Sequence, residues 1–250
     1  MLESGSIPAD GTDDDLAALE LLGLLGYPSV VRVWNMVDRI NVVDDQGQDV
    51  YGRFCRGRAS AFERHEVSGT LIPAATCVGN HGGGIAFYFL ACRSASVTNI
   101  ENPRQIPAYQ YPRRYGIKAP SFARATYLST GRADRPDHLF VSGTAGIIGH
   151  ETVHRGDVER QCATTLENIA ALVSGENLAR YGIGADLTLH DLHTVKVYVK
   201  HDADVDLVRR MCSSAFARHA DVAYTNVDIC RDDLLVEIEG VASPRPARSL

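Results

Sequence analysis

Alternation of apolar and polar residues near the carboxyl end constrains the fold of this chain more than any other feature. Residues 234–239 read L-L-V-E-I-E, so the side chains at even positions point to one side of a strand while Glu237 and Glu239 point to the other. Residues 227–230, V-D-I-C, alternate in the same way, and the R-D-D between the two runs is typical of a turn. The sequence therefore predicts a β-hairpin over residues 226–240.

Two carboxylates on one face of a strand have two interpretations. The pattern alone favours a solvated face, because charged side chains are rarely buried without a partner. Alternatively, Glu237 or Glu239 lines a cleft, where loss of water raises the pKa of the carboxyl group and prepares it to donate a proton. The alternation itself does not decide between the two.

Regular elements follow one another in the second half of the chain. The patterns predict, in order, a strand at 138–142, a helix at 157–173, a strand at 194–200, a helix at 204–218 and the hairpin. This order favours an α+β fold, with helices packed on one face of a mixed sheet. We assign it to a C-terminal domain at 131–243 and treat 244–250, which lacks periodicity, as a tail.

Residues 1–130 are predicted to form a separate N-terminal subdomain. Its expected elements are a helix at 13–25, a strand at 29–36, a helix at 50–64 and a central strand at 85–91. Arg58 lies on the apolar face of the second helix. A cation on such a face needs an internal carboxylate or a bound anion as its partner.

The segment 99–124 is the part of the chain richest in side chains suited to ligand recognition. Its four prolines exclude a long helix, yet it also holds three tyrosines and four arginines. Such side chains on a rigid, irregular scaffold suit the recognition of a planar, carboxylated ligand. A surface loop without a ligand is the other interpretation.

Composition limits the classes of partner. The 250 residues carry a net charge of −6 and no long run of Lys or Arg, so neither nucleic acid nor an anionic membrane is an expected partner. Six cysteines without C-x-x-C spacing indicate reduced thiols in the cytoplasm. The acidic start lacks the pattern of a signal peptide, and the longest apolar runs are too short to span a membrane.

Two short motifs imitate catalytic signatures and are set aside. H-E-T-V-H at 150–154 fits the zinc-protease pattern, which requires a helix that places both histidines on one face. Here glycines flank the motif, and helical periodicity begins only after it. H-G-G-G at 81–84 is similar to an oxyanion-hole loop, but the chain has no G-x-S-x-G elbow. We therefore expect no metal site and no catalytic serine.

The second half of the chain resembles the reactive-intermediate deaminase A family. The matching stretches are L-F-V-S-G-T-A-G at 139–146, G-H-E-T-V-H at 149–154, T-L-E-N-I at 165–169, V-K-V-Y-V at 195–199 and L-L-V-E-I-E at 234–239. Family members of this kind are small α+β trimers with clefts between subunits. The arginine that holds a substrate carboxylate in those deaminases falls at Tyr224 here, so imine hydrolysis is not implied.

The first half narrows the resemblance to the chorismatases. The matching stretches are R-V-W-N-M-V-D-R-I-N at 32–41, Y-G-R-F-C-R-G-R-A at 51–59, I-E-N-P-R-Q at 100–105, Y-Q-Y-P-R-R-Y-G at 109–116 and P-S-F-A-R-A at 120–125. The resemblance implies two deaminase A-like (chorismate-mutase-like) units, a homotrimer and cleavage of chorismate without a cofactor. Chorismatases usually have roughly a hundred further residues at the amino end. The N-terminal unit is therefore expected to be shortened, as a true variant or through a late start in the gene model.

The resemblance also implies roles for individual residues. Glu237 is the acid that protonates the methylene carbon of the enolpyruvyl ether and so releases pyruvate. Cys230 and Gly143 match the members that form 3-hydroxybenzoate, in which the substrate's own C4 hydroxyl captures the cation. The chain's candidate substrate-binding residues are Arg58, Tyr109, Tyr115, Arg124, Gly143 and Thr144.

Alternatives remain open at this point. A hydrolytic chorismatase would use water and give a dihydroxycyclohexadiene carboxylate. A non-catalytic, deaminase-like protein would bind an aromatic acid or a partner without turnover. Cys230 is equally explained as a small buried apolar residue and Gly143 as a bend.

Overall fold

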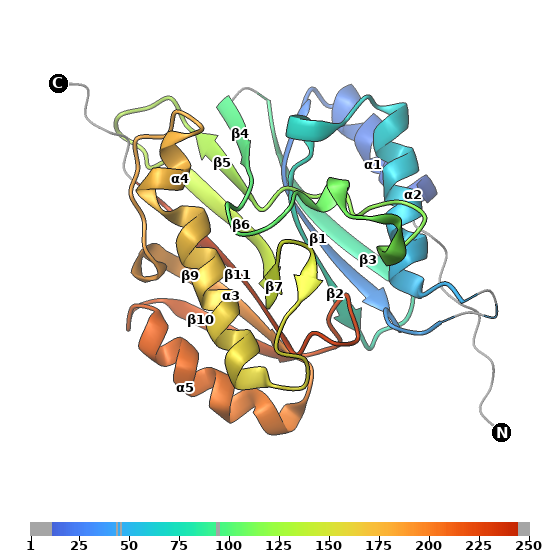
Figure 1. The fold of residues 1–250 in the computed structure, drawn as a ribbon. Coiled ribbons are helices and arrows are strands. Elements are labelled where there is room, and N and C mark those ends of the chain that lie inside the picture. The colour runs from blue at the N-terminus through green and yellow to red at the C-terminus, as the bar shows by residue number, and fades with distance from the viewer. Residues whose placement is uncertain (1–11, 44, 46, 94–95, 245–250) are drawn as a thin grey trace.

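The computed structural model describes residues 12–43, 45, 47–93 and 96–244. Two sheets dominate it, a six-stranded sheet and a three-stranded sheet, and each is covered by helices on one face (Figure 1). The predicted α+β class with mixed sheets is confirmed. Of the predicted tail at 244–250, all but Pro244 lies outside the described residues.

The six-stranded sheet has the order β10-β9-β11-β6-β5-β4. Its strands are β4 (Ser96–Ile100), β5 (Ala125–Ser129), β6 (His138–Ala145), β9 (Leu192–Val199), β10 (Asp221–Asn226) and β11 (Val236–Ala242). Strands β9 and β10 run parallel, and the other neighbours run antiparallel. Strands β4 and β5 come from the region assigned to the N-terminal subdomain, so the two predicted units share this sheet.

Three helices follow the strands of this sheet. They are α3 (Val158–Val173), α4 (Gly175–Ala179) and α5 (Val205–Ala215). Helices α3 and α5 lie on the same face of the sheet in Figure 1, as the sequence predicted. Ile169 and Cys212 from these helices pack on Val236 and Ile238 from β11 in the largest apolar cluster. Burial of these side chains is the main force that holds helices and sheet together.

The predicted hairpin at 226–240 is wrong. Strand β9 lies between β10 and β11, and β11 pairs with β9 and β6 instead. The chain leaves the sheet after Asn226 and reaches the other sheet, where the carbonyl of Asp228 accepts a hydrogen bond from Gly79 N at 2.8 Å. Val227 and Ile229 are buried in a second apolar cluster. Their alternation therefore reflects packing of a loop between two sheets, with a single antiparallel bridge from Ile229 to Val78 of β2 and no hairpin.

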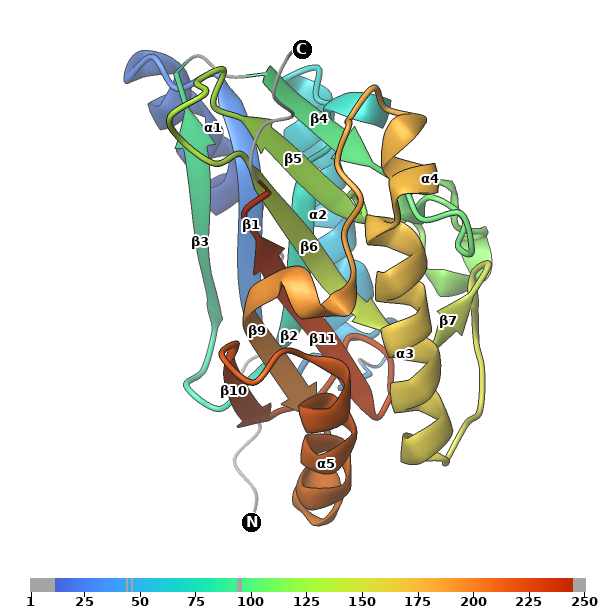
Figure 2. The same ribbon diagram turned by 90° about the vertical axis from the view of Figure 1, so that its left-hand side faces the viewer.

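The three-stranded sheet has the order β2-β1-β3. Its elements and the helices beside it are α1 (Thr12–Leu24), β1 (Ser29–Asp38), α2 (Val50–Arg64), β2 (Ala74–Asn80) and β3 (Ile85–Cys92). The prediction of a central strand at 85–91 is wrong, because β3 is an edge strand, visible at the left-hand side of Figure 2. Tyr88 and Leu90 on β3 are 43% and 45% exposed. The run is apolar throughout, but in β3 its residues alternate between half-buried and exposed.

Side chains of β1 join the two sheets. Trp34 Nε1 and an Nη of Arg32 donate hydrogen bonds to Glu239 on β11, at 2.7 and 2.8 Å. On the opposite side of β1, Asn35 accepts a hydrogen bond from Arg58 of α2 at 2.6 Å. The three-stranded sheet therefore lies between α2 and the six-stranded sheet.

The stretch that imitates a zinc-protease motif is not helical. His150 lies in the turn between β7 (Ile147–Ile148) and β8 (Glu151–Thr152), and His154 follows β8 with a positive φ of 54°. The two histidines therefore do not share a helix face. Among the described residues, no helix combines the length and the apolar character needed to cross a membrane.

Candidate active site

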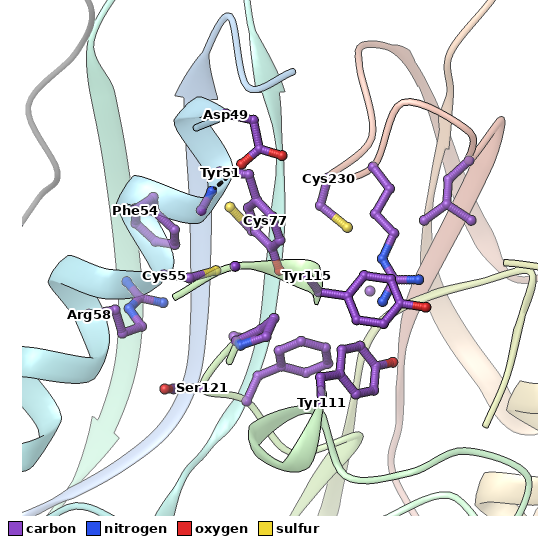
Figure 3. A pocket seen from close by; sticks show the side chains of 18 of the residues that line it. Asp49, Tyr51, Phe54, Cys55, Arg58, Cys77, Tyr111, Tyr115, Ser121 and Cys230 are labelled. Carbon is purple, nitrogen blue, oxygen red and sulfur yellow. Dashed lines mark hydrogen bonds between the residues drawn. The ribbon is translucent and has the colours of Figure 1, made fainter. Parts of the chain in front are cut away.

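A cavity of about 440 Å³ lies where α2 and β2 face the six-stranded sheet. Its walls come from α2, β2, β6, the segment 111–124 and the segment 230–237. Figure 3 shows Tyr111 and Tyr115 on one side of the cavity and Phe54, Cys55 and Arg58 of α2 on the other. Aromatic walls with a few charged groups are typical of small-molecule sites.

Glu237 lines this cavity from β11 and is only 3% exposed. The pKa of its carboxyl group is raised to about 8, chiefly because burial removes water and further because Glu239 is close, while Arg32 and Arg124 oppose the shift. Within the part of the chain that the structure describes, no donor forms a hydrogen bond with this carboxyl. Glu237 is therefore a neutral acid near pH 7 and can donate a proton.

Gly143 makes room for this acid. The pairing of β6 and β11 shifts register between Ile238 and Gly240, which indicates a β-bulge in β6 beside Gly143. A Cβ atom at position 143 would lie 1.9 Å from Oε1 of Glu237, far inside nonbonded contact. The carboxyl group can occupy its position only because residue 143 lacks a side chain.

Glu239 lies two residues from Glu237 on the same strand but has the opposite environment. Arg32, Trp34 and Thr76 donate hydrogen bonds to its carboxylate, and Lys196 Nζ lies 3.3 Å from Oε1. Two cations and two neutral donors therefore surround this carboxylate. The expectation of a solvated face for the two glutamates is wrong, since both are buried. One is a neutral acid and the other a partnered carboxylate.

Arg124 offers a buried cation to the cavity. It is 2% exposed, and one Nη donates to the hydroxyl of Tyr111 at 2.7 Å and to the carbonyl of Ile106 at 3.0 Å. Its Nε finds no acceptor among the described residues. A buried guanidinium with an unused donor is suited to a carboxylate ligand, which it can hold with two parallel hydrogen bonds.

Arg58 brings a second buried cation from α2. Its guanidinium donates to Asn35 and lies 4.7 Å from the ring centroid of Phe54. Asp49 caps the start of α2 by accepting a hydrogen bond from Gly52 N at 2.6 Å, which fixes the helix that positions Arg58. Arg58 and Arg124 both line the cavity, from different elements. The site therefore has two arginines for anionic groups of a ligand.

Three thiols surround Tyr51 on the wall of the cavity, and Cys55, Cys77 and Cys230 are labelled in Figure 3. Burial raises the pKa of each thiol, that of Cys55 to about 12. The thiol form is a poor nucleophile, since the thiolate is the reactive species. These cysteines therefore form a neutral, weakly reactive surface beside Glu237.

One wall of the cavity is lined by aromatic and basic side chains. The guanidinium carbon of Arg231 lies 4.0 Å from the ring centroid of Tyr115 and 5.1 Å from that of Tyr111. The hydroxyl of Tyr115 lies 3.2 Å from Nδ1 of His150, and Arg114 pairs with Glu151. These contacts join the segment 111–124 to the segment before β11.

The structure brings together most of the residues singled out from the sequence. The cavity is lined by Glu237, Cys230, Arg58, Tyr115, Arg124 and Gly143. Tyr109 and Thr144 are not in its lining. Tyr109 lies near Glu101 and Tyr181, and Thr144 is buried with its hydroxyl bonded to the carbonyl of Ser142.

Sequence reasoning missed Tyr111, Tyr51 and Arg231 as cavity residues. Tyr111 lies in the same irregular segment as Tyr109, and no periodicity there indicates which tyrosine faces inward. Tyr51 carried a signal, its place on the apolar face of α2. Among the described residues, no three or more His, Cys, Asp or Glu side chains form a group suited to a metal ion.

Comparisons with known proteins point to one family. A family model described as "Chorismatase FkbO/Hyg5-like, N-terminal" matches residues 7–91. The 3-hydroxybenzoate synthase of Streptomyces hygroscopicus is 52% identical over 245 residues, which are 95% of this chain and 72% of that protein. A chorismatase of Streptomyces rapamycinicus is 50% identical over 224 residues, which are 90% of this chain and 67% of that protein.

One solved structure gives a matching result. A crystal structure of a chorismatase overlays with a TM-score of 0.90 at 44% sequence identity, covering 95% of this chain and 71% of the other. A RidA protein from an Antarctic Psychrobacter covers 58% of this chain with a TM-score of 0.42 and 17% identity.

Proposed function

Because this chain belongs to the chorismatase family of FkbO and Hyg5, we propose that it cleaves chorismate to 3-hydroxybenzoate and pyruvate. The observation that carries the proposal is the neutral carboxyl of Glu237 in a cavity with two buried arginines. The identity of 52% to a 3-hydroxybenzoate synthase supports this product over the hydrolytic one.

The first step is protonation of carbon by Glu237. The proton goes to the methylene carbon of the enolpyruvyl ether and leaves an oxocarbenium ion beside the ionised carboxylate. Carbon accepts a proton poorly, so a large part of the rate must come from positioning of the acid. Burial of Glu237 against the bulge at Gly143 supplies that positioning, because the carboxyl has a fixed place with no alternative partner.

The second step is capture of the cation by the substrate. The C4 hydroxyl oxygen attacks C3, the bond from C3 to the ether oxygen breaks, and its electron pair forms the carbonyl of pyruvate. The hydroxyl proton returns to Glu237, and the arene oxide rearranges to the phenol. Water is not consumed, so a cavity wall of neutral thiols at Cys55, Cys77 and Cys230 favours this path by keeping competing nucleophiles away.

Two arginines anchor the substrate in this proposal. Chorismate carries two carboxylates, one on the ring and one on the side chain. Arg124 lines the cavity and has an Nε without an acceptor among the described residues, and Arg58 lines the cavity from α2. Bidentate binding of both carboxylates would fix the methylene carbon relative to Glu237.

We further place the protein in the cytoplasm as a homotrimer. Six free cysteines fit a reducing compartment. The exposed Tyr88 and Leu90 on edge strand β3 provide apolar surface that a second copy would cover. Three subunits are the number that the resemblance stated from the sequence implies.

Product analysis tests the function. The protein is incubated with chorismate, and products are separated by liquid chromatography and identified by mass. We expect pyruvate and 3-hydroxybenzoate in equal amounts. A dihydrodiol with pyruvate would assign the hydrolytic reaction instead, and the absence of pyruvate release would assign a binding protein.

The pH dependence of the reaction follows from the state of Glu237. The acid acts in its protonated form, which is complete below the pKa and lost above it. With a pKa of about 8, kcat/KM should stay level from pH 6 to 7.5 and fall tenfold per pH unit well above 8. Initial rates measured across this pH range give the pH at which kcat/KM begins to fall, which is the falling limb of the profile. A limb near the ordinary glutamate pKa of 4.5 would show that the site does not hold the acid neutral.

Arg124→Lys should raise KM about tenfold with a smaller effect on kcat. Lysine keeps the charge but loses the planar fork that can bind a carboxylate through two hydrogen bonds. Arg104→Lys in the same segment is the matched control, because Arg104 pairs with Glu167 on the surface. Steady-state kinetics with a melting curve for each variant separate binding from stability. An unchanged KM in Arg124→Lys would remove Arg124 from the substrate site.

A further inference from the structure

Behind the proposed acid lies a group of buried polar side chains that the proposed reaction does not use. Arg32 is 1% exposed and Glu239 4% exposed, and the two are joined at 2.8 Å. The hydroxyl of Thr76 contacts both side chains and also accepts a hydrogen bond from Gly143 N at 2.9 Å. Thr76 therefore connects the partners of Glu239 to the bulge on which Glu237 rests.

Lys196 extends this group to the surface. Its Nζ lies 3.3 Å from Glu239 and donates to the hydroxyl of Tyr88 at 2.8 Å. It also lies 5.1 Å from the ring centroid of Trp34, which stacks on Tyr88. The side chain of Lys196 is 35% exposed, so it can be replaced without opening the core.

Glu237 and Glu239 compete for one proton. Both project from the same face of β11, at a spacing of about 7 Å along the strand. Arg32, Trp34, Thr76 and Lys196 all reach Glu239, whereas none of them donates to Glu237. When two carboxyl groups share a low-dielectric site, the charge settles on the better partnered one and the proton on the other.

We propose that Glu239 is a positioning residue, whose charge, fixed by Arg32, Trp34, Thr76 and Lys196, holds the proton on Glu237 at neutral pH. This inference rests on the proposed function, since it explains how the acid of that reaction stays loaded. It assigns the buried ion pair a role in catalysis besides joining two sheets. The other titratable groups around Glu237 are Arg124, which lowers the pKa of Glu237, and Tyr198, Cys77 and Cys230, whose pKa values Glu237 raises.

Two substitutions that change the charge near Glu237 in opposite directions test this proposal. Glu239→Gln removes a negative charge beside Glu237, so the falling limb of kcat/KM should move to lower pH by about one unit or more. Lys196→Met removes a positive charge while Arg32 still pairs with Glu239, so the limb should move to higher pH by a smaller amount. Lys118→Met removes the same kind of charge from a surface pair with Glu63 and serves as the matched control, with the limb left in place.

The two shifts separate electrostatics from structure. A purely structural role of Glu239 would lower activity at every pH without moving the limb, and that result would overturn the proposal. If Glu239→Gln does not fold, Lys196→Met decides, and an unmoved limb there refutes the proposal. The pKa of Glu237 is also read by NMR of protein labelled with ¹³C at glutamate carboxyls. That titration needs no substrate, so a protein that does not cleave chorismate still tests the role of Glu239.

Discussion

Glu237→Gln should lower kcat for pyruvate release from chorismate by about 10³-fold or more. Glutamine keeps the size of the side chain but cannot release a proton at any pH of interest. Among the described residues, the other carboxyl groups in the lining belong to Asp49, which caps α2, and Asp232, which pairs with Lys200, so neither replaces Glu237. A coupled assay with lactate dehydrogenase follows pyruvate, and the same assay without enzyme gives the background.

The control for this variant is binding. Loss of a neutral carboxyl removes no charge from the cavity at pH 7, so chorismate should bind Glu237→Gln about as tightly as the unchanged protein, measured by calorimetry. Weak binding would mean that the substitution disturbed the cavity. Full turnover with normal binding would assign the acid to another residue.

Gly143→Ala should lower kcat/KM about 10²-fold and divert part of the product to the dihydrodiol. The new methyl group would lie 1.9 Å from Oε1 of Glu237, so the end of that flexible side chain must move. A displaced acid protonates the methylene carbon less efficiently and leaves room for water near the cation. The ratio of 3-hydroxybenzoate to dihydrodiol, measured by chromatography, reports the change.

Gly23→Ala provides the matched control for this prediction. A Cβ at Gly23 in α1 meets no atom within 4 Å, and alanine is favoured over glycine in a helix by about 1 kcal/mol. The control should therefore keep full activity with equal or higher thermal stability. Unchanged rate and product in Gly143→Ala would show that position 143 does not set the place of the acid.

Local periodicity predicted the elements that depend on a single apolar face. Helices α2, α3 and α5 lie where the sequence placed them, because each has one stripe of apolar side chains that must be buried. Strands β1, β6 and β9 also lie where the sequence placed them, although β1 and β6 are buried on both faces. The buried Arg58 also followed from its place on such a stripe.

Features that depend on a second part of the chain were not predictable in this way. The alternation at 227–230 is the same for a strand and for a loop pressed between two sheets, and the partner at Gly79 lies far away in the sequence. Tyr109 and Tyr111 have the same chemistry in an irregular segment, so only the structure distinguishes the one in the cavity.

The two glutamates show the same limit at the candidate site. Their spacing placed both on one face, and the structure confirms this arrangement. It could not show that Arg32 and Lys196 meet Glu239 and leave Glu237 with none, because these cations come from other strands. The neighbouring cations and hydrogen-bond donors, more than the position on the strand, decide which of the two glutamates is the acid.

The central claim is that the Glu237 carboxyl is protonated at neutral pH. Infrared difference spectra between the unchanged protein and Glu237→Gln test it directly, because a protonated carboxyl absorbs apart from a carboxylate. The subtraction also removes the signal of Glu101, because this residue is present in both proteins. Burial raises the pKa of Glu101 to about 7. We predict a protonated-carboxyl band at pH 7 that disappears as the pH rises through about 8. A difference spectrum that shows only carboxylate at pH 7 would contradict the account.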